Sequence, residues 1–333
     1  MTDLFLFILS LCATFLLTVI LLKWLIPVLK SRKMGQKILE IGPRWHKNKE
    51  GTPTMGGLSF IWAALALALV GFVLLGVRDG LKAIVPGAIT FIYALLNGMI
   101  GVIDDKAKLR HKKNEGLTAK QKYLLQLLVA GAYLIAMALT KSITTALYIP
   151  YFGVEIELGI AYYVVALLLL TGIVNSVNLT DGIDGLASSV TSVVGVFFAL
   201  AAFLGRAGEF APSVSLLSAL MIGGTLGFLV YNFYPARVFM GDTGSLFLGG
   251  LVVGVAFLMG NPLIVLVLGF TYLMETASVM LQVTYFKLTH GKRIFKMAPI
   301  HHHFEQCGFT EIGIVALFVA LTLAFGGLAW LGL

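Results

Sequence analysis

Charged residues are scarce in this sequence. Only 12% of its 333 residues are Asp, Glu, Lys or Arg, whereas 59% are hydrophobic and the mean hydropathy is +0.95. A soluble domain carries about 25% charged residues, so an ordinary soluble fold is excluded. Because apolar runs recur along nearly the whole chain, we expect one integral-membrane domain over residues 1–333 and no separate soluble domain.

Cysteine is nearly absent, and acidic residues are outnumbered by basic ones. Cys12 lies in the first apolar run and Cys307 in a basic loop on the opposite side of the predicted topology, so no disulfide is expected. The net charge of +8 could indicate nucleic acid. However, the basic residues lie in short loops beside apolar runs, where orientation signals and anionic lipid headgroups account for them. Nucleic acid is therefore not an expected partner.

Apolar runs of about 20 residues, the length that spans a bilayer as a helix, are abundant. They predict an all-α polytopic membrane protein with about ten transmembrane helices. Pairs of small residues, such as Gly223/Gly227 and Gly250/Gly254, permit close helix packing within the fold or between subunits. The predicted spans lie near 4–27, 56–76, 84–103, 123–140, 160–176, 187–204, 213–231, 245–260, 263–286 and 311–332.

The basic residues predict how the chain is oriented. Segments 28–55 and 104–122 carry seven Lys or Arg each, and 287–310 carries four. By the positive-inside rule these loops face the cytoplasm. Two spans separate successive loops of this set, so 177–186 and 232–244 lie on the same side. We expect five cytoplasmic loops, both termini outside, and a small external β-hairpin near 148–158, where apolar residues alternate with Glu155 and Glu157.

Asp104 and Asp105 follow directly on an apolar run. A helix C-terminus disfavours carboxylates, so capping does not account for the pair. One alternative is a solvated boundary cluster neutralised by Lys106 and Lys108. The other is a magnesium or proton-transfer site at the membrane surface, since Mg²⁺ typically binds one or two carboxylates plus substrate phosphates.

Two further polar loops join apolar spans. In 175–185, Thr180 or Asp181 could cap the next helix, but two Asn and two Asp exceed one cap and could bind a ribose, base or sugar. In 232–245, Asp242 is either an N-cap or a metal ligand beside a phosphate held at the helix N-terminus.

Three adjacent histidines, His301 to His303, lie in a basic loop. Adjacent residues on a helix point in different directions, so these three make a poor zinc cage. Phosphate binding or proton transfer is favoured over a merely solvated basic loop. Glu275 lies deep in the ninth predicted span, so it is a functional candidate. For Glu275 and for Gln282, seven residues on, a structural hydrogen bond to a neighbouring helix is an equal alternative.

Carboxylates and lysines at one membrane surface indicate a metal-bridged polyphosphate, and the membrane indicates a lipid partner. These features favour phosphoryl-group transfer from a soluble nucleotide to a lipid phosphate. A proton-coupled transporter is the rival from another class, but it predicts acids spread through the membrane depth.

These residues resemble motifs of the polyprenyl-phosphate N-acetylhexosamine-1-phosphate transferases, in the family's order. The segment 297–305, Met-Ala-Pro-Ile-His-His-His-Phe-Glu, is similar to the signature of that family's muramoyl-pentapeptide branch. The other matching segments are Gly51-Thr-Pro-Thr54-Met-Gly-Gly57, Asp104-Asp105-x-x-Lys108, Asn178-Leu-Thr-Asp-Gly-Ile-Asp184-Gly-Leu and Gly241-Asp-Thr-Gly-Ser245.

The resemblance implies ten spans, a bacterial inner (cytoplasmic) membrane location with the active site facing the cytoplasm, a homodimer and a requirement for Mg²⁺. It implies that UDP-MurNAc-pentapeptide and undecaprenyl phosphate give lipid I and UMP, the first membrane step of peptidoglycan synthesis. Transfer of GlcNAc-1-phosphate from UDP-GlcNAc, another specificity of the family, is the nearest alternative. Because a lipid phosphate is already anionic near neutral pH, we favour its direct attack over a covalent intermediate on Asp242.

The resemblance also implies site residues. Asp104 and Asp105 would be the acidic pair that deprotonates or orients the lipid phosphate, and Asp242 and Asp105 would hold the metal. Lys108, Lys120 and His301 would contact phosphates, and Phe239 would stack on uracil. The other residues of the implied nucleoside-sugar pocket are Lys49, Thr54, Asn175, Asn178, Asp181, Asp184, Asn232, Gln282 and His302.

Overall fold

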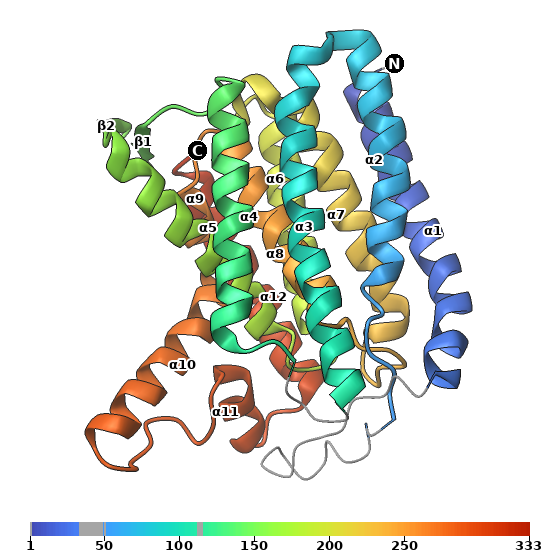
Figure 1. Ribbon diagram of the computed structural model, residues 1–333, viewed down its shortest axis with the longest axis vertical. Helices are drawn as coiled ribbons and strands as arrows, with labels where there is room; N and C mark the ends of the chain where they lie inside the picture. The colour runs from blue at the N-terminus through green and yellow to red at the C-terminus, as the bar shows by residue number, and fades with distance from the viewer. Residues whose placement is uncertain (1, 33–48, 50, 112–115) are drawn as a thin grey trace.

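The structure is a computed structural model that describes residues 2–32, 49, 51–111 and 116–333 (Figure 1). Parts of the predicted loops 28–55 and 104–122 therefore lie outside the described residues. The chain forms a bundle of helices, most of which run along its long axis (Figure 1). Its elements are α1 (Asp3–Ser31), α2 (Leu58–Asp79), α3 (Leu81–His111), α4 (Ala119–Leu139), β1 (Ala146–Ile149), β2 (Val154–Glu157), α5 (Ile160–Thr180), α6 (Leu186–Phe203), η2 (Gly208–Phe210), α7 (Ala211–Asn232), α8 (Gly241–Leu258), α9 (Ile264–Leu268), α10 (Phe270–Leu288), α11 (Ile300–Gln306) and α12 (Glu311–Trp330).

Among the described residues, nine helices are long and apolar enough to cross a membrane, which confirms a polytopic all-α membrane protein. The predicted span 263–286 differs in form from the other nine. It is divided into α9 and α10 at Gly269, whose N–H donates to the carbonyl of Val265 (2.8 Å). The buried residues of α10 all fall in its first half, and its second half leads away from the bundle (Figure 1).

Helix α8 forms the centre of the bundle, because every residue from Thr243 to Leu258 is buried. The small-residue pairs serve packing within the fold, as one of the two alternatives predicted. A Cβ added at Gly227 of α7 would lie 2.7 Å from the carbonyl oxygen of Phe15 on α1, and one at Gly254 of α8 would lie 2.7 Å from Thr90 Cγ2 on α3. The absence of these side chains lets the backbones approach closely.

The two ends of the bundle are different. At the upper end in Figure 1, β1 and β2 pair as an antiparallel hairpin with Tyr148 opposite Glu155, which confirms the predicted hairpin. Both chain termini lie toward this end, where the Tyr151 hydroxyl donates to the carbonyl of Leu328 (3.1 Å). Cys12 and Cys307 are free thiols, as expected. The polar loops gather at the opposite end.

Candidate active site

Helix α8 is capped by a side chain from another helix. Asp105, near the end of α3, accepts hydrogen bonds from the backbone N–H of Asp242 (3.2 Å) and from the N–H (2.9 Å) and hydroxyl (2.7 Å) of Thr243. Its carboxylate thereby satisfies donors that a helix N-terminus leaves free and lies at the positive end of the helix dipole. The alternative that Asp242 caps α8 is wrong, because α8 has no cap from its own N-terminal residue and Asp242 lies within its first turn.

The side chain of Asp242 is held by three other helices. Its Oδ2 accepts from Lys108 of α3 (3.0 Å) and Lys122 of α4 (2.7 Å), and its Oδ1 accepts from the amide of Asn178 on α5 (3.0 Å). The same amide donates to the hydroxyl of Ser245 (2.8 Å). Four helices, α3, α4, α5 and α8, therefore meet at one carboxylate.

Asp104 completes the acidic cluster. Its Oδ1 accepts from the backbone N–H of Leu117 (2.7 Å), and its Oδ2 pairs with Lys108 (2.8 Å). Asp104 and Asp105 are each only 3% exposed. The alternative of a solvated boundary cluster is therefore wrong for this pair, although Lys106 is exposed as that alternative expected.

The three carboxylates fit a hard divalent cation. Asp104, Asp105 and Asp242 each offer an oxygen, and the three oxygens lie within 4.8 Å of one another. An ionised carboxylate has about four lone-pair positions. Counting the donors above, Asp105 and Asp242 accept from three described groups each and Asp104 pairs with two, so each carboxylate keeps a position for a metal. Oxygen donors in such a set suit Mg²⁺.

A second charged network adjoins the first. The ammonium of Lys49 contacts Asp184 Oδ1 (2.8 Å) and Glu311 Oε2 (2.6 Å), and it lies 5.8 Å from the centre of the Tyr234 ring. Asp184 also accepts from the N–H of Ala236 (2.9 Å) through its Oδ2. The network joins the ends of predicted loops 28–55, 177–186, 232–244 and 287–310. Sequence reasoning missed Glu311, because a lone Glu at the start of a span looks like an ordinary first-turn residue.

The segment before α2 runs beside the segment before α8. Phe239 N–H donates to the Pro53 carbonyl (2.8 Å) and its carbonyl accepts from Gly56 N–H (2.9 Å). Thr54 is buried beside Gly241, and the Phe239 side chain is half-buried. The pairing places Thr54 and Phe239 next to the carboxylate cluster.

Asp181 lies just beyond α5 and does not cap α6, because α6 begins after Gly185 with no side-chain cap. The alternative of pure capping is therefore wrong for Thr180 and Asp181. Burial, together with the negative charges of Asp242, Asp105 and Asp184, raises the pKa of Asp181 well above its usual value.

The histidines have three different surroundings. His301 is fully buried, with Nδ1 3.0 Å from Glu275 Oε2, and its ring faces Gly182. His302 Nδ1 lies 2.6 Å from Glu305 Oε2, and His303 Nδ1 accepts from the N–H of Lys296 (3.2 Å). The three side chains therefore have separate polar neighbours, although the rings of His301 and His302 lie 4.1 Å apart. The solvated-loop alternative is wrong for His301.

Comparisons with known proteins identify the family of this chain. The pattern of glycosyl transferase family 4 matches residues 87–260, and signature 1 of phospho-N-acetylmuramoyl-pentapeptide-transferase matches residues 49–61. The chain is 43% identical to a phospho-N-acetylmuramoyl-pentapeptide-transferase of Clostridium perfringens (strain SM101 / Type A) over 98% of this chain and 96% of the relative. The chain belongs to the phospho-N-acetylmuramoyl-pentapeptide-transferase family. Relatives of the same name from Clostridium acetobutylicum (42%, covering 97% of this chain and 98% of the relative) and Staphylococcus saprophyticus (41%, covering 95% and 96%) span nearly the same length.

In this transferase, a multi-pass membrane enzyme, a lysine that was not predicted reaches the cluster, and the predicted contact of Lys120 with phosphate stays a prediction. Lys120 is exposed at the start of α4, whereas Lys122 reaches Asp242 and Asn178. The reason is helical geometry, because residues two apart on a helix point about 200° apart and only one can face the cluster. Sequence reasoning had no signal to separate the two lysines.

Three predicted pocket amides of the transferase are engaged by its own groups. Asn175 donates to Gln126 (2.7 Å), Asn232 links Gly185 N–H (3.1 Å) to the Val238 carbonyl (3.0 Å), and Gln282 accepts from Phe295 N–H (3.0 Å). Each fixes the backbone or a helix next to the site. Their contact with substrate stays a prediction.

Proposed function

We propose that this enzyme transfers phospho-MurNAc-pentapeptide from UDP-MurNAc-pentapeptide to undecaprenyl phosphate, giving lipid I and UMP. The observation that carries the proposal is the buried cluster of three carboxylates with Lys108 and Lys122 at one end of a membrane bundle. Such a cluster matches a diphosphate and a lipid acceptor, and the relatives' names supply the sugar-peptide. On this proposal the cluster faces the cytoplasm from the inner membrane of a bacterium, and the enzyme is a homodimer.

Asp242, Asp105 and Asp104 would hold Mg²⁺. When bound, the cation neutralises charge on the diphosphate. The rest of the chemistry belongs to protein groups. Lys108 and Lys122, each within 3.0 Å of Asp242, would neutralise phosphate oxygens, and their shared carboxylate keeps both ammonium groups in place.

The transfer needs no covalent enzyme intermediate. An oxygen of the lipid phosphate forms a bond to the phosphorus that carries the sugar, and the bond from that phosphorus to the bridging oxygen breaks, so UMP leaves with the electron pair. Asp104 would orient the acceptor phosphate or take its remaining proton. We expect that incubation with labelled UDP-MurNAc-pentapeptide in the absence of lipid will leave no label on the protein. A phospho-MurNAc adduct trapped on Asp242 would refute direct attack.

His301 would contact a substrate phosphate and Glu275 would orient it. The backbone N–H of His301 donates to Glu275 Oε2 (3.5 Å), and His301 Nδ1 lies 3.0 Å from the same oxygen. These contacts hold the imidazole with Nε2 toward the loop at Gly182. This role would account for an acid at a fully buried position of α10.

The test is UMP release by the purified protein from each nucleotide sugar, with and without polyprenyl phosphate and Mg²⁺. We expect release from UDP-MurNAc-pentapeptide only when both are present, loss with a chelator, and recovery when Mg²⁺ is restored. Release from UDP-GlcNAc alone would change the assigned sugar. No release from either nucleotide would favour the transporter.

A further inference from the structure

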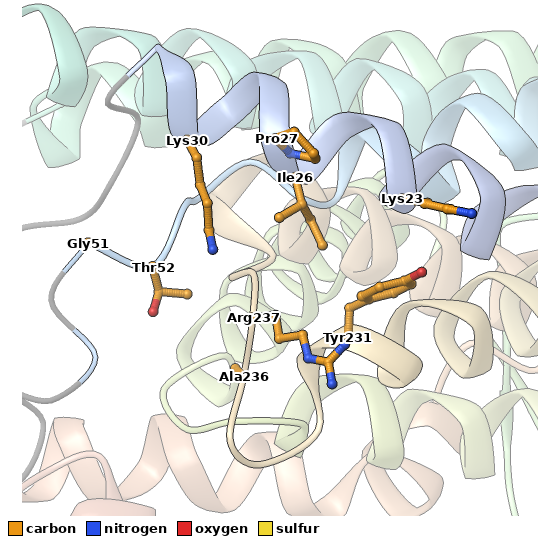
Figure 2. Close-up of a pocket in the computed structure, with 9 residues that line it drawn as sticks. All are labelled: Lys23, Ile26, Pro27, Lys30, Gly51, Thr52, Tyr231, Ala236 and Arg237. Carbon is orange, nitrogen blue, oxygen red and sulfur yellow. The ribbon is translucent and has the colours of Figure 1, made fainter.

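A basic pocket lies outside the carboxylate cluster. Its volume is about 520 Å³, and three segments form it: one face of α1, the chain before α2, and the end of α7 with the following loop (Figure 2). None of its lining side chains belongs to the carboxylate cluster, and Ala236 touches the neighbouring network only through its backbone N–H. The lining residues are Lys23, Ile26, Pro27, Lys30, Gly51, Thr52, Tyr231, Ala236 and Arg237.

The described walls of the pocket carry positive charge. Lys23, Lys30 and Arg237 line it, and none of its described lining residues is acidic. Among the described residues, none of these three cations forms an ion pair with a carboxylate, in contrast to Lys49, Lys108 and Lys122 in the two networks above. Three cations that line one cavity make its potential positive, so the arrangement favours an anionic ligand.

The cations are arranged on a single face of α1. The four α1 residues of the pocket follow the spacing i, i+3, i+4 and i+7, which places Lys23 and Lys30 on one stripe with Ile26 and Pro27 between them (Figure 2). A positive-inside signal requires only basic residues near the helix end and not a shared face. Arg237 lines the same cavity from the loop after α7. The positive-inside rule does not explain why basic residues of two separate segments line one cavity.

The position of the pocket favours a lipid over a soluble ligand. Helix α1 is long and apolar enough to cross a membrane, and only 22% of its most apolar segment is buried, so it lies at the edge of the bundle. Trp24, next to Lys23, is 72% exposed, as is usual for aromatic residues at a membrane interface. Lys23 lies about 10 Å farther along the helix axis than Lys30, toward the middle of the span. The positive charge therefore extends into the depth of lipid headgroups.

The walls of the pocket are fixed by close packing. At Gly227 of α7, one turn before Tyr231, a Cβ would lie 2.7 Å from the backbone of α1, so the two helices meet tightly just above the cavity. On the other side, Arg237 N–H donates to the Tyr231 carbonyl (2.8 Å), which closes the loop on α7. A preformed cavity requires little reorganisation to bind a ligand.

We propose that this pocket binds the phosphate group of an anionic membrane phospholipid of the inner leaflet. Arg237 suits bidentate contact with phosphate oxygens, Lys23 and Lys30 supply further charge, and Ile26, Pro27 and Tyr231 contact the glycerol and upper acyl chain. The site is independent of the transfer reaction and leaves the carboxylate cluster free for its substrates.

Native mass spectrometry of the full chain tests the proposal. The protein is released from nanodiscs of phosphatidylcholine mixed with phosphatidylglycerol, and retained phosphatidylglycerol is counted. We expect Lys23→Gln and Lys30→Gln each to lower its retention about fivefold, and Arg237→Gln to lower it further. Lys82→Gln, an exposed lysine at the opposite end of the bundle, is the matched control and should leave retention unchanged.

Two outcomes would overturn the lipid assignment. Equal retention in the three pocket variants and in Lys82→Gln would show that the pocket binds no anionic lipid. Displacement of the lipid by excess inorganic phosphate would identify a soluble-phosphate site instead. If Arg237→Gln disturbs folding, the two lysine variants decide, because Lys23 and Lys30 are exposed helix positions whose loss leaves no buried group unpaired. UMP release by the same variants separates this result from failure of the proposed transferase activity.

Discussion

Both ends of the bundle carry carboxylates, but these side chains are buried at one end and exposed at the other. At the loop end, Asp104 and Asp105 are each 3% exposed and are held by backbone N–H groups and an ammonium. At the hairpin end, Glu155 and Glu157 are exposed, and Glu157 accepts only from neighbours such as Gly159 N–H (3.1 Å). Burial of a carboxylate is costly unless fixed donors compensate it. The difference indicates that the fold supplies fixed donors for the acids at the loop end, whereas solvent hydrates the acids of the hairpin.

The largest effect is expected at Asp242. Asp242→Asn leaves Lys108 and Lys122 without their shared counter-charge and removes a proposed metal ligand. We expect UMP release to fall by a factor of about 10²–10³. Glu157→Gln at the hairpin is the control and should retain full activity. Near-normal turnover of Asp242→Asn would show that Asp242 is not a metal ligand. It would also contradict the functional difference between the two ends of the bundle.

The same substitution at Asp104 and at Asp105 should have different effects on stability. Both changes to Asn are expected to reduce activity severely, but only Asp105 caps α8 through both oxygens. Asp105→Asn should therefore also lower the free energy of unfolding by about 1 kcal/mol. Thermal unfolding in detergent measures this. Equal stability losses in the two variants would contradict the capping role.

Lys122 and Lys120 provide a matched pair on one helix. Lys122→Gln removes a 2.7 Å contact with Asp242 and should lower activity about tenfold or more. Lys120→Gln, at an exposed position, should change it less than about twofold. Steady-state UMP release decides between them, and a larger loss in Lys120→Gln would favour Lys120 as the lysine that contacts phosphate.

The smallest effect concerns stability and pH at Asp181. Its pKa is raised in the folded protein, so the ionised form is disfavoured by folding, and a stability penalty develops as pH rises above the usual carboxyl pKa. Asp181→Asn should therefore increase thermal stability near pH 7 in the presence of a chelator, with a smaller gain near pH 5. A gain that grows as pH falls would contradict the sign of the shift.

Much of the fold follows from the sequence because bilayer length and charge patterning are strong constraints. The apolar runs predicted the spans that became α1–α8 and α12, and the alternation beside Glu155 predicted the hairpin. The division at Gly269 was not predictable from a continuous apolar run, because the direction of α10 depends on its neighbours in space.

The acidic cluster was predicted in composition and not in geometry. Adjacent Asp104 and Asp105 indicated a site, but nothing in the sequence distinguished the capping carboxylate from its neighbour. Glu311 and Lys122 were missed because their partners, Asp184 and Asp242, lie 127 and 120 residues away along the chain. Such long-range pairs depend on how α12 and α4 pack, which local patterns do not encode.

Divalent-cation binding most directly tests whether the loop-end acids form one reaction centre. Electron paramagnetic resonance of the purified protein titrated with Mn²⁺, a stand-in for Mg²⁺, reports bound against free cation. We predict a single tight site that weakens strongly in Asp242→Asn and Asp105→Asn and is unchanged in Glu157→Gln. Equal Mn²⁺ affinity in the wild-type protein and Asp242→Asn would contradict the account.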